Sequence, residues 1–252
     1  MKRIVCKKAD IGRGPLILVN SANPLRNAGV SLIPLELTSQ GGGESIYLER
    51  RAANLLTACI QAVGGQRDIV PVSGWRSRRE QQQIWDDTLR SDGEEFTRKY
   101  VAPPDCSEHQ TGLAIDLGRA AGRIDFIRPA FPYDGICGKF RRQAAAYGFI
   151  QRYEQGKEAL TGIAAEPWHF RYVGAPHARL MQQNNLCLEE YVPFLRTGPK
   201  SCALTEGRLV QVFHAPCQGE ETEIELPDQC GSVQVSGDNI NGFIVTVWRD
   251  RI

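Results

Sequence analysis

The clearest repeating pattern in the chain is a helical stripe of apolar residues over positions 46–63. The residues that would share one face of this helix are Leu48, Ala52, Leu55, Leu56, Cys59, Ile60 and Val63. This spacing predicts an amphipathic helix, which a Gly-Gly pair should end. A second helix is expected to start after Ser77, because Ser77 and Glu80 have the spacing of a capping box, and to stop near residues 91–93.

Short apolar runs bounded by Gly, Pro, Asp or Asn predict strands. In the first two thirds of the chain they lie at 69–72, 113–117 and 168–173. Residues 138–147 predict a further helix, and residues 176–196 predict two short ones. Helices and strands are therefore mixed along the chain.

The last part of the chain begins after a Gly-Pro-Lys-Ser linker at 198–201. The strands predicted beyond it are 209–213, 222–226, 232–235 and 243–248. At the other end, residues 1–45 carry many Gly, Pro and Asn and predict a wrapping arm rather than a packed element. Residues 118–137 form a long irregular connection, and loops of that length inside a compact domain are usually functional.

Composition and charge exclude several classes of partner. The 252 residues include 30 Lys and Arg against 29 Asp and Glu, which gives a net charge of +1. This charge provides no excess of basic residues for binding nucleic acid or an anionic membrane. No apolar segment approaches the ~20 residues that span a bilayer, and Met1–Gly14 lacks a signal-peptide core. We therefore expect a cytoplasmic protein with a small, specific partner. Its eight scattered cysteines predict reduced, mostly buried thiols.

The first segment with chemical potential runs from Ser107 to Asp116. His109 lies on a predicted loop, and seven residues later Asp116 lies inside an apolar strand. A buried carboxylate without a partner is costly, so Asp116 is expected to bind a cation or accept strong hydrogen bonds. Zinc is a natural candidate because it accepts both imidazole nitrogen and carboxylate oxygen.

A second segment, residues 166–172, supplies another imidazole beside another carboxylate. His169 would complete three zinc ligands with His109 and Asp116. Three protein ligands with one open position are typical of a catalytic zinc, whereas a structural zinc has four. Glu166, three positions before His169, could then act as general base toward water at the open position.

Other polar residues have different predicted roles. Arg76 lies between a strand and a helix, where it could donate hydrogen bonds to an oxyanion or a substrate carboxylate. His177 and His214 are interpreted as ordinary structural histidines, and Cys106 as a bystander thiol. His109, Asp116 and Arg76 could each be structural alone; their combination favours a metal site.

Three blocks of sequence resemble a known family. They are Ser73-Gly74-Trp75-Arg76-Ser77, the pattern Ser107-x-His109-x-x-Gly112-x-Ala114-x-Asp116, and Glu166-x-Trp168-His169-x-Arg171-Tyr172-Val173-Gly174. In order and approximate spacing they resemble the signature blocks of the D-alanyl-D-alanine peptidases of the VanX, VanY and VanXY group. The resemblance covers about residues 15–190 and stops before the strands beyond 198.

The resemblance implies a zinc-dependent D,D-dipeptidase and D,D-carboxypeptidase, closest to the VanG-type VanXY enzymes. Such an enzyme hydrolyses D-Ala-D-Ala and the terminal D-Ala of the peptidoglycan precursor pentapeptide in the cytoplasm, and so contributes to vancomycin resistance. Its partners are small peptides and one Zn²⁺ per chain. The resemblance assigns the zinc ligands His109, Asp116 and His169, the base Glu166, the transition-state donor Arg76, and the dipeptide contacts Ser107 and Gln81.

The same resemblance implies an α+β fold, with a small antiparallel sheet that carries the zinc site and helices packed behind it, as in hedgehog-like domains. We expect a catalytic domain over residues 1–197 and a small β-rich appendage over 198–252. The balance between the two activities is expected to depend on loops over the pocket, at 118–137 or 154–165.

Two other functions fit the same ligands. An L-alanyl-D-glutamate endopeptidase of the phage-lysin type resembles this family in fold and metal site, and its appendage would bind the cell wall. A non-catalytic zinc module is the second alternative. Glu166 argues against it, because a site without catalysis has no physical need for a base beside its metal.

Overall fold

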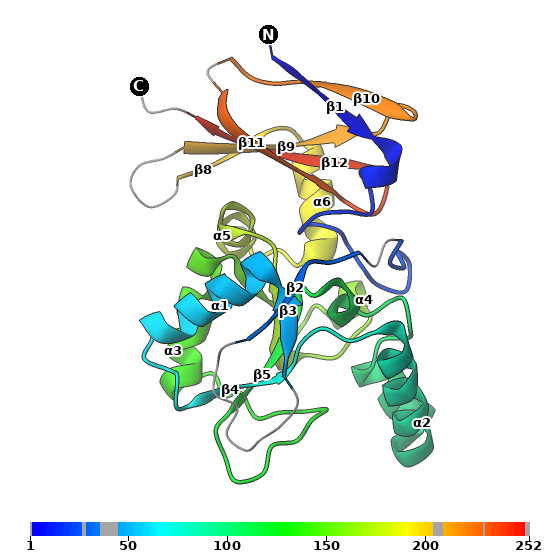
Figure 1. Ribbon diagram of the computed structural model, residues 1–252, viewed down its shortest axis with the longest axis vertical. Helices are drawn as coiled ribbons and strands as arrows, with labels where there is room; N and C mark the ends of the chain where they lie inside the picture. Colours follow the sequence, from blue (N-terminus) through cyan, green and yellow to red (C-terminus); the bar gives the residue numbers. More distant parts are fainter. Residues whose placement is uncertain (1, 27–28, 36–44, 204–208, 229, 250–252) are drawn as a thin grey trace. The chain divides into compact units, whose positions relative to one another are not determined.

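The computed structural model describes residues 2–26, 29–35, 45–203, 209–228 and 230–249 (Figure 1). The chain forms two compact units, a central unit of Val19–Ala178 and a terminal unit of Met1–Leu18 with Arg179–Ile252. In the part of the chain that is described, no helix is both long and apolar enough to cross a membrane.

The central unit is built on a four-stranded antiparallel sheet. In spatial order its strands are β4 (Ile69–Ser73), β5 (Ala114–Arg119), β7 (Glu166–Tyr172) and β6 (Phe149–Tyr153). Asp116 on β5 pairs with Ser73 on one side and with His169 on the other. Directly paired residues of antiparallel strands place their side chains on the same face, so this register brings chemistry from separate segments together.

Helix α1 (Arg50–Ala62) and helix α3 (Gly135–Ala144) pack against each other beside this sheet (Figure 1). The apolar stripe of α1 joins the core, as its spacing predicted. Glu49 caps the helix by accepting hydrogen bonds from the backbone N–H groups of Arg51 and Ala52, at 2.8 and 3.0 Å. The helix is shorter than predicted, because residues 47–49 form a strand before it.

Helix α2 (Arg78–Tyr100) begins with the predicted capping box of Ser77 and Glu80. The predicted stop at 91–93 is confirmed, because Gly93 has a non-helical backbone with φ 85° and ψ 171°; a second helical stretch then continues to Tyr100 within α2. The following loop leads into η2 (Glu108–Thr111), a short 3-10 helix that ends at the left-handed Gly112. This short helix contacts β5 and places His109 beside Asp116 of that strand.

The remaining elements of the central unit are smaller. They are β2 (Leu32–Pro34) paired with β3 (Tyr47–Glu49), η3 (Ala145–Tyr147), α4 (Glu158–Thr161) and the first residues of α5 (Ala175–Gln183). The aromatic core of the unit is formed by Phe131, Phe140 and Phe170, whose rings meet edge to face at centroid distances of 5.0–5.9 Å.

The terminal unit is formed from both ends of the chain. Strand β1 (Arg3–Lys7) pairs antiparallel with β10 (Glu221–Glu225), and a separate sheet has the order β11-β12-β9-β8. The bounds of its other elements are η1 (Lys8–Asp10), α6 (Leu188–Arg196), β8 (Lys200–Ala203), β9 (Leu209–Pro216), β11 (Cys230–Gly237) and β12 (Gly242–Arg249).

The predicted α+β class with small antiparallel sheets is confirmed. The prediction of an unpacked arm was wrong for Arg3–Lys7, whose partner strand lies too far along the sequence for a local pattern to reveal. The strands predicted beyond residue 208 are present; β9, β11 and β12 are longer than predicted, and β10 is shifted by one residue. The division of the chain into 1–197 and 198–252 stays a prediction.

Candidate metal centre

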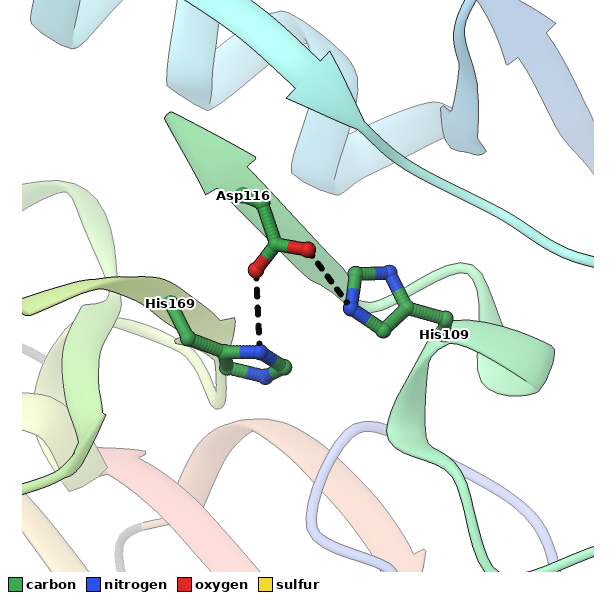
Figure 2. A group of neighbouring side chains, drawn as sticks. All are labelled: His109, Asp116 and His169. Carbon is green, nitrogen blue, oxygen red and sulfur yellow. Dashed lines mark ion pairs between the residues drawn. The ribbon is translucent and has the colours of Figure 1, made fainter. Parts of the chain in front are cut away.

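Three side chains from three elements converge on one face of the central sheet (Figure 2). His109 comes from η2, Asp116 from β5 and His169 from β7, and all three are buried. Each offers one ligand atom, and these atoms all lie within 4.8 Å of one another. That spacing allows all three to bind a single metal ion. Among the described residues, no other group of His, Cys, Asp and Glu has this geometry.

Asp116 lies between the two imidazoles, with one oxygen toward each ring. Its Oδ2 is 3.2 Å from Nε2 of His109, and its Oδ1 is 3.0 Å from Nδ1 of His169. Burial raises the pKa of Asp116, but the two histidines outweigh burial and hold it well below the usual range. Asp116 is therefore a charged carboxylate at neutral pH.

This donor set fits a zinc ion. The buried Oδ1 of Asp116 has no hydrogen bond, although buried oxygens of this kind are nearly always satisfied. A cation between the three side chains would account for it. Two imidazole nitrogens and one carboxylate oxygen are ligands that zinc accepts, and a three-residue set leaves a position for water or substrate.

The ring of His109 is held from behind by the backbone. Its Nδ1 is 2.7 Å from the carbonyl oxygen of Gly74, so Nε2 is the nitrogen that faces Asp116. Burial and the nearby Arg76 lower the pKa of His109 to about 4. The ring is therefore neutral at physiological pH, as metal ligation requires.

Glu166 lies at the start of β7, buried beside the same group. Its Oε2 is 3.4 Å from Nδ1 of His169. Burial is the largest cause of the rise in the pKa of Glu166 to about 8, while His169 and Asp116 act in opposite directions. A carboxyl group with a pKa near neutral can both accept and return a proton.

Arg76 is fixed at the edge of the group by three hydrogen bonds. It donates from Nε to Ser73 Oγ at 2.9 Å, and from its terminal nitrogens to Gln81 Oε1 at 3.0 Å and Asp116 Oδ2 at 3.2 Å. Gln81 in turn donates to the Ala102 carbonyl at 2.7 Å. The side chain of Gln81 therefore orients Arg76 from the first turns of α2.

All seven residues predicted for the site line one pocket. Ser107 is buried at its wall, and the other predicted residues are Arg76, Gln81, His109, Asp116, Glu166 and His169. Apolar and aromatic side chains complete the lining, among them Tyr100, Phe126, Tyr153 and Trp168. Phe126 comes from the long connection at 118–137, as expected of a loop over the pocket.

The sequence prediction missed a buried group of charges next to this site. Glu108, Arg152 and Arg171 have fully buried side chains, and both arginines contact Glu108 Oε1, at 2.8 and 2.7 Å. The available signal was spacing: Arg171 lies two residues after His169 on β7, so both side chains point to the same face. Nothing in the local pattern distinguished Glu108 or Arg152 from surface charges.

The residues predicted to be bystanders lie outside the metal group. His177 is buried, and burial lowers its pKa to about 3. His214 belongs to the terminal unit, where its Nε2 is 3.0 Å from Asp238 Oδ2. All eight cysteines are free, and Cys106 is only partly buried.

Comparison with known proteins agrees with this geometry. Residues 45–175 match the family described as VanY, D-alanyl-D-alanine carboxypeptidase. The chain is 38% identical over 181 residues to the bifunctional D-Ala-D-Ala dipeptidase and D-Ala-D-Ala carboxypeptidase VanXYC of Enterococcus gallinarum, covering 71% of this chain and 94% of the relative.

Two solved structures extend the likeness. The vancomycin resistance D,D-dipeptidase VanXYg, in complex with a D-Ala-D-Ala phosphinate analog, is 47% identical with a TM-score of 0.92, over 98% of this chain and 99% of that chain. The E175A mutant of the vancomycin resistance D,D-pentapeptidase VanY from a VanB-type cassette, in complex with Zn(II), is 29% identical with a TM-score of 0.57, over 70% and 98%. The chain therefore belongs to the VanY family of D-alanyl-D-alanine carboxypeptidases.

Proposed function

We propose that this protein is a zinc-dependent D,D-dipeptidase and D,D-carboxypeptidase that contributes to vancomycin resistance by hydrolysing D-Ala-D-Ala and the terminal D-Ala of the precursor pentapeptide. The observation that carries the proposal is the convergence of His109, Asp116 and His169, with Glu166 beside them. The likeness to VanXYC, a bifunctional dipeptidase and carboxypeptidase, and to VanXYg, solved with a D-Ala-D-Ala analog, supports this choice of substrate.

In this proposal His109, Asp116 and His169 hold one zinc ion per chain. The presence of a single group of this kind among the described residues supports that stoichiometry. When bound, zinc supplies the Lewis acidity that makes water a nucleophile at neutral pH and polarises the scissile carbonyl. A cytoplasmic location follows from the resemblance to VanXY enzymes and belongs to the same proposal.

Glu166 is the proposed general base. It would take the proton of the attacking water and deliver it to the leaving amine, so one carboxylate serves both halves of the hydrolysis. Arg76 would donate hydrogen bonds to the oxygen that gains negative charge, because its guanidinium is already oriented by Ser73 and Gln81. Ser107 and Gln81 are proposed to contact the bound dipeptide, since both line the pocket.

The test measures free D-Ala released from D-Ala-D-Ala and from a D-Ala-ending pentapeptide by the zinc-loaded protein, with and without a chelator. Release from both substrates that the chelator abolishes is the expected result. A protein that releases no D-Ala but cuts an L-Ala-D-Glu bond, or that sediments with peptidoglycan sacculi without either activity, would contradict the proposal and favour the endopeptidase or binding-module alternative.

A Glu166→Ala variant tests the mechanism. We expect it to retain zinc and to lose D-Ala release by at least about 100-fold, the usual contribution of a general base. Glu95→Ala, which removes an exposed glutamate of α2, is the matched control and should keep full activity. Ordinary turnover by the Glu166→Ala protein would show that the base has been assigned to the wrong residue.

A further inference from the structure

Behind the ring of His169 lies a buried charge cluster of Glu108, Arg152 and Arg171. The side chains of all three residues are fully buried. They come from three elements, because Glu108 lies on η2, Arg152 on β6 and Arg171 on β7. A buried carboxylate of this kind persists only when cations or strong donors compensate it, and the two guanidinium groups do so here.

The two arginines occupy only one oxygen of the carboxylate. Nε of Arg152 and Nη1 of Arg171 both lie against Oε1 of Glu108, at 2.8 and 2.7 Å. The other oxygen, Oε2, faces Nε2 of His169 at 3.7 Å. Within the described structure neither Glu108 Oε2 nor His169 Nε2 has a hydrogen bond. Two buried polar atoms thus face each other and lack other partners for hydrogen bonding.

The opposite side of the same ring belongs to the metal group. Nδ1 of His169 lies 3.0 Å from Asp116 Oδ1 and 3.4 Å from Glu166 Oε2. Nδ1 is therefore the nitrogen that would bind zinc, and in a neutral imidazole the proton must then be on Nε2. That N–H points toward Oε2 of Glu108, the carboxylate oxygen that accepts no other hydrogen bond.

The other histidine, His109, is also held through its second ring nitrogen, in this case by a backbone carbonyl group. His109 faces Asp116 through Nε2, while its rear nitrogen lies 2.7 Å from the Gly74 carbonyl. Metal-binding histidines usually donate their second N–H to a carboxylate or carbonyl, which fixes the tautomer and the ring plane. The second nitrogen of His109 thus faces the Gly74 carbonyl, and the second nitrogen of His169 faces the Glu108 carboxylate.

We propose that Glu108 is a positioning residue: when zinc is bound, its Oε2 accepts a hydrogen bond from Nε2–H of His169 and so holds Nδ1 toward the ion. Arg171 keeps the carboxylate in place through its other oxygen, and Arg152 adds a second contact that compensates the buried charge. This inference rests on the proposed zinc centre. It distinguishes Glu108 from a purely structural ion pair that ties η2 to the sheet.

The test compares two variants of the full chain that break the same Glu108–Arg152 contact. Glu108→Gln removes the carboxylate, whereas Arg152→Met leaves it in place beside Arg171. We expect Glu108→Gln to weaken zinc binding about 10- to 100-fold in a chelator competition assay. Arg152→Met should lower the melting temperature yet keep zinc affinity within about threefold of the wild type. Equal losses of zinc affinity in both variants would overturn the proposal.

A second measurement needs no variant. Long-range ¹H–¹⁵N correlation spectra of the zinc-loaded wild-type chain report which nitrogen of His169 carries the proton. We expect Nε2–H with the downfield proton shift of a hydrogen bond to a carboxylate, and a proton on Nδ1 would overturn the proposal even if Glu108→Gln failed to fold. A wild-type protein that binds zinc but releases no D-Ala would remove the proposed function and leave this inference standing.

Discussion

Each oxygen of Asp116 faces a different imidazole, at 3.2 and 3.0 Å, and this one residue links the two histidines of the site. The two rings respond differently to this shared neighbour. Burial and the nearby Arg76 lower the pKa of His109 to about 4. Burial lowers the pKa of His169 too, but Asp116 and Glu108 outweigh burial and raise it to about 9. In the metal-free protein, His169 is therefore charged at neutral pH.

This difference predicts that zinc binding at pH 7 releases at least one proton. A histidine must be neutral to bind zinc, so the ion has to displace the proton of His169, and apparent zinc affinity should rise with pH up to about 9. Calorimetry in buffers of different ionisation enthalpy measures the number released. At pH 7 Glu166 also holds a proton, because its pKa is raised to about 8. The Glu166→Gln variant lacks this proton, so its zinc binding should release about one proton. A binding enthalpy that is independent of the buffer at pH 7 would contradict this prediction.

The three residues of the metal group could be picked out from the sequence because they lie in two short segments. His109 and Asp116 lie within one short segment, and Glu166 lies three residues from His169. The support of His169 could not be predicted, since the buried charges Glu108 and Arg152 meet only after η2 and β6 have packed together. In a sequence, a buried charged residue looks the same as an exposed one.

At the scale of elements, local signals predicted the start and the interruption of α2 but not the pairing of distant strands. The capping box of Ser77 and Glu80 forms as predicted, because all its atoms belong to one turn. Gly93 ends the first helical stretch of α2 where predicted, but a local signal did not reveal that a second stretch follows it directly. The pairing of Asp116 with His169 depends on a register between strands that are distant in sequence, so periodicity could not reveal it.

Helix α5 contains a buried histidine that should make stability depend on pH. Burial lowers the pKa of His177 to about 3 in the folded protein, against about 6.5 when the chain is unfolded. Below pH 6.5 the unfolded state therefore binds a proton that the folded state does not. The stability that comes from the neutral ring is complete above pH 6.5 and is lost as pH falls toward 3, by about 1.4 kcal/mol per pH unit.

The measurement is urea unfolding of the wild type and of His177→Gln at pH 6.5 and 5.5. We expect the wild type to lose about 1 kcal/mol more than the variant over this interval, because glutamine does not titrate. Other titrating groups, including His109 and His169, are common to both proteins and cancel in the comparison. Parallel losses in the two proteins would show that His177 is protonated in the folded state.

At the scale of the whole molecule, the candidate site lies within one of the two units. All seven predicted site residues and the matched family region lie between Val19 and Ala178. The terminal unit contains none of them. The likeness to VanXYg nevertheless covers 98% of this chain, so both units share that resemblance.

A glycine of the terminal unit tests whether the units are independent in stability. A Cβ at Gly237 would lie 1.9 Å from the carbonyl oxygen of Ile11, so Gly237→Ala must separate β11 from the amino-terminal segment. We expect hydrogen exchange to quicken in β9–β12, while zinc affinity and D-Ala release stay unchanged. Gly122→Ala, where the added Cβ meets nothing within 4 Å, is the control. Equal loss of protection in β4–β7 would contradict this prediction.

The pairing of β1 with β10 also has a consequence for biosynthesis. Arg3–Lys7 leave the ribosome early, but their partner Glu221–Glu225 follows only after the central unit has been translated. The central unit is one continuous stretch of chain, so it can fold while translation is still in progress. The segment that forms β1 therefore stays without its partner strand until β10 has been made, and an unpaired strand of this kind is a template for aggregation during that interval.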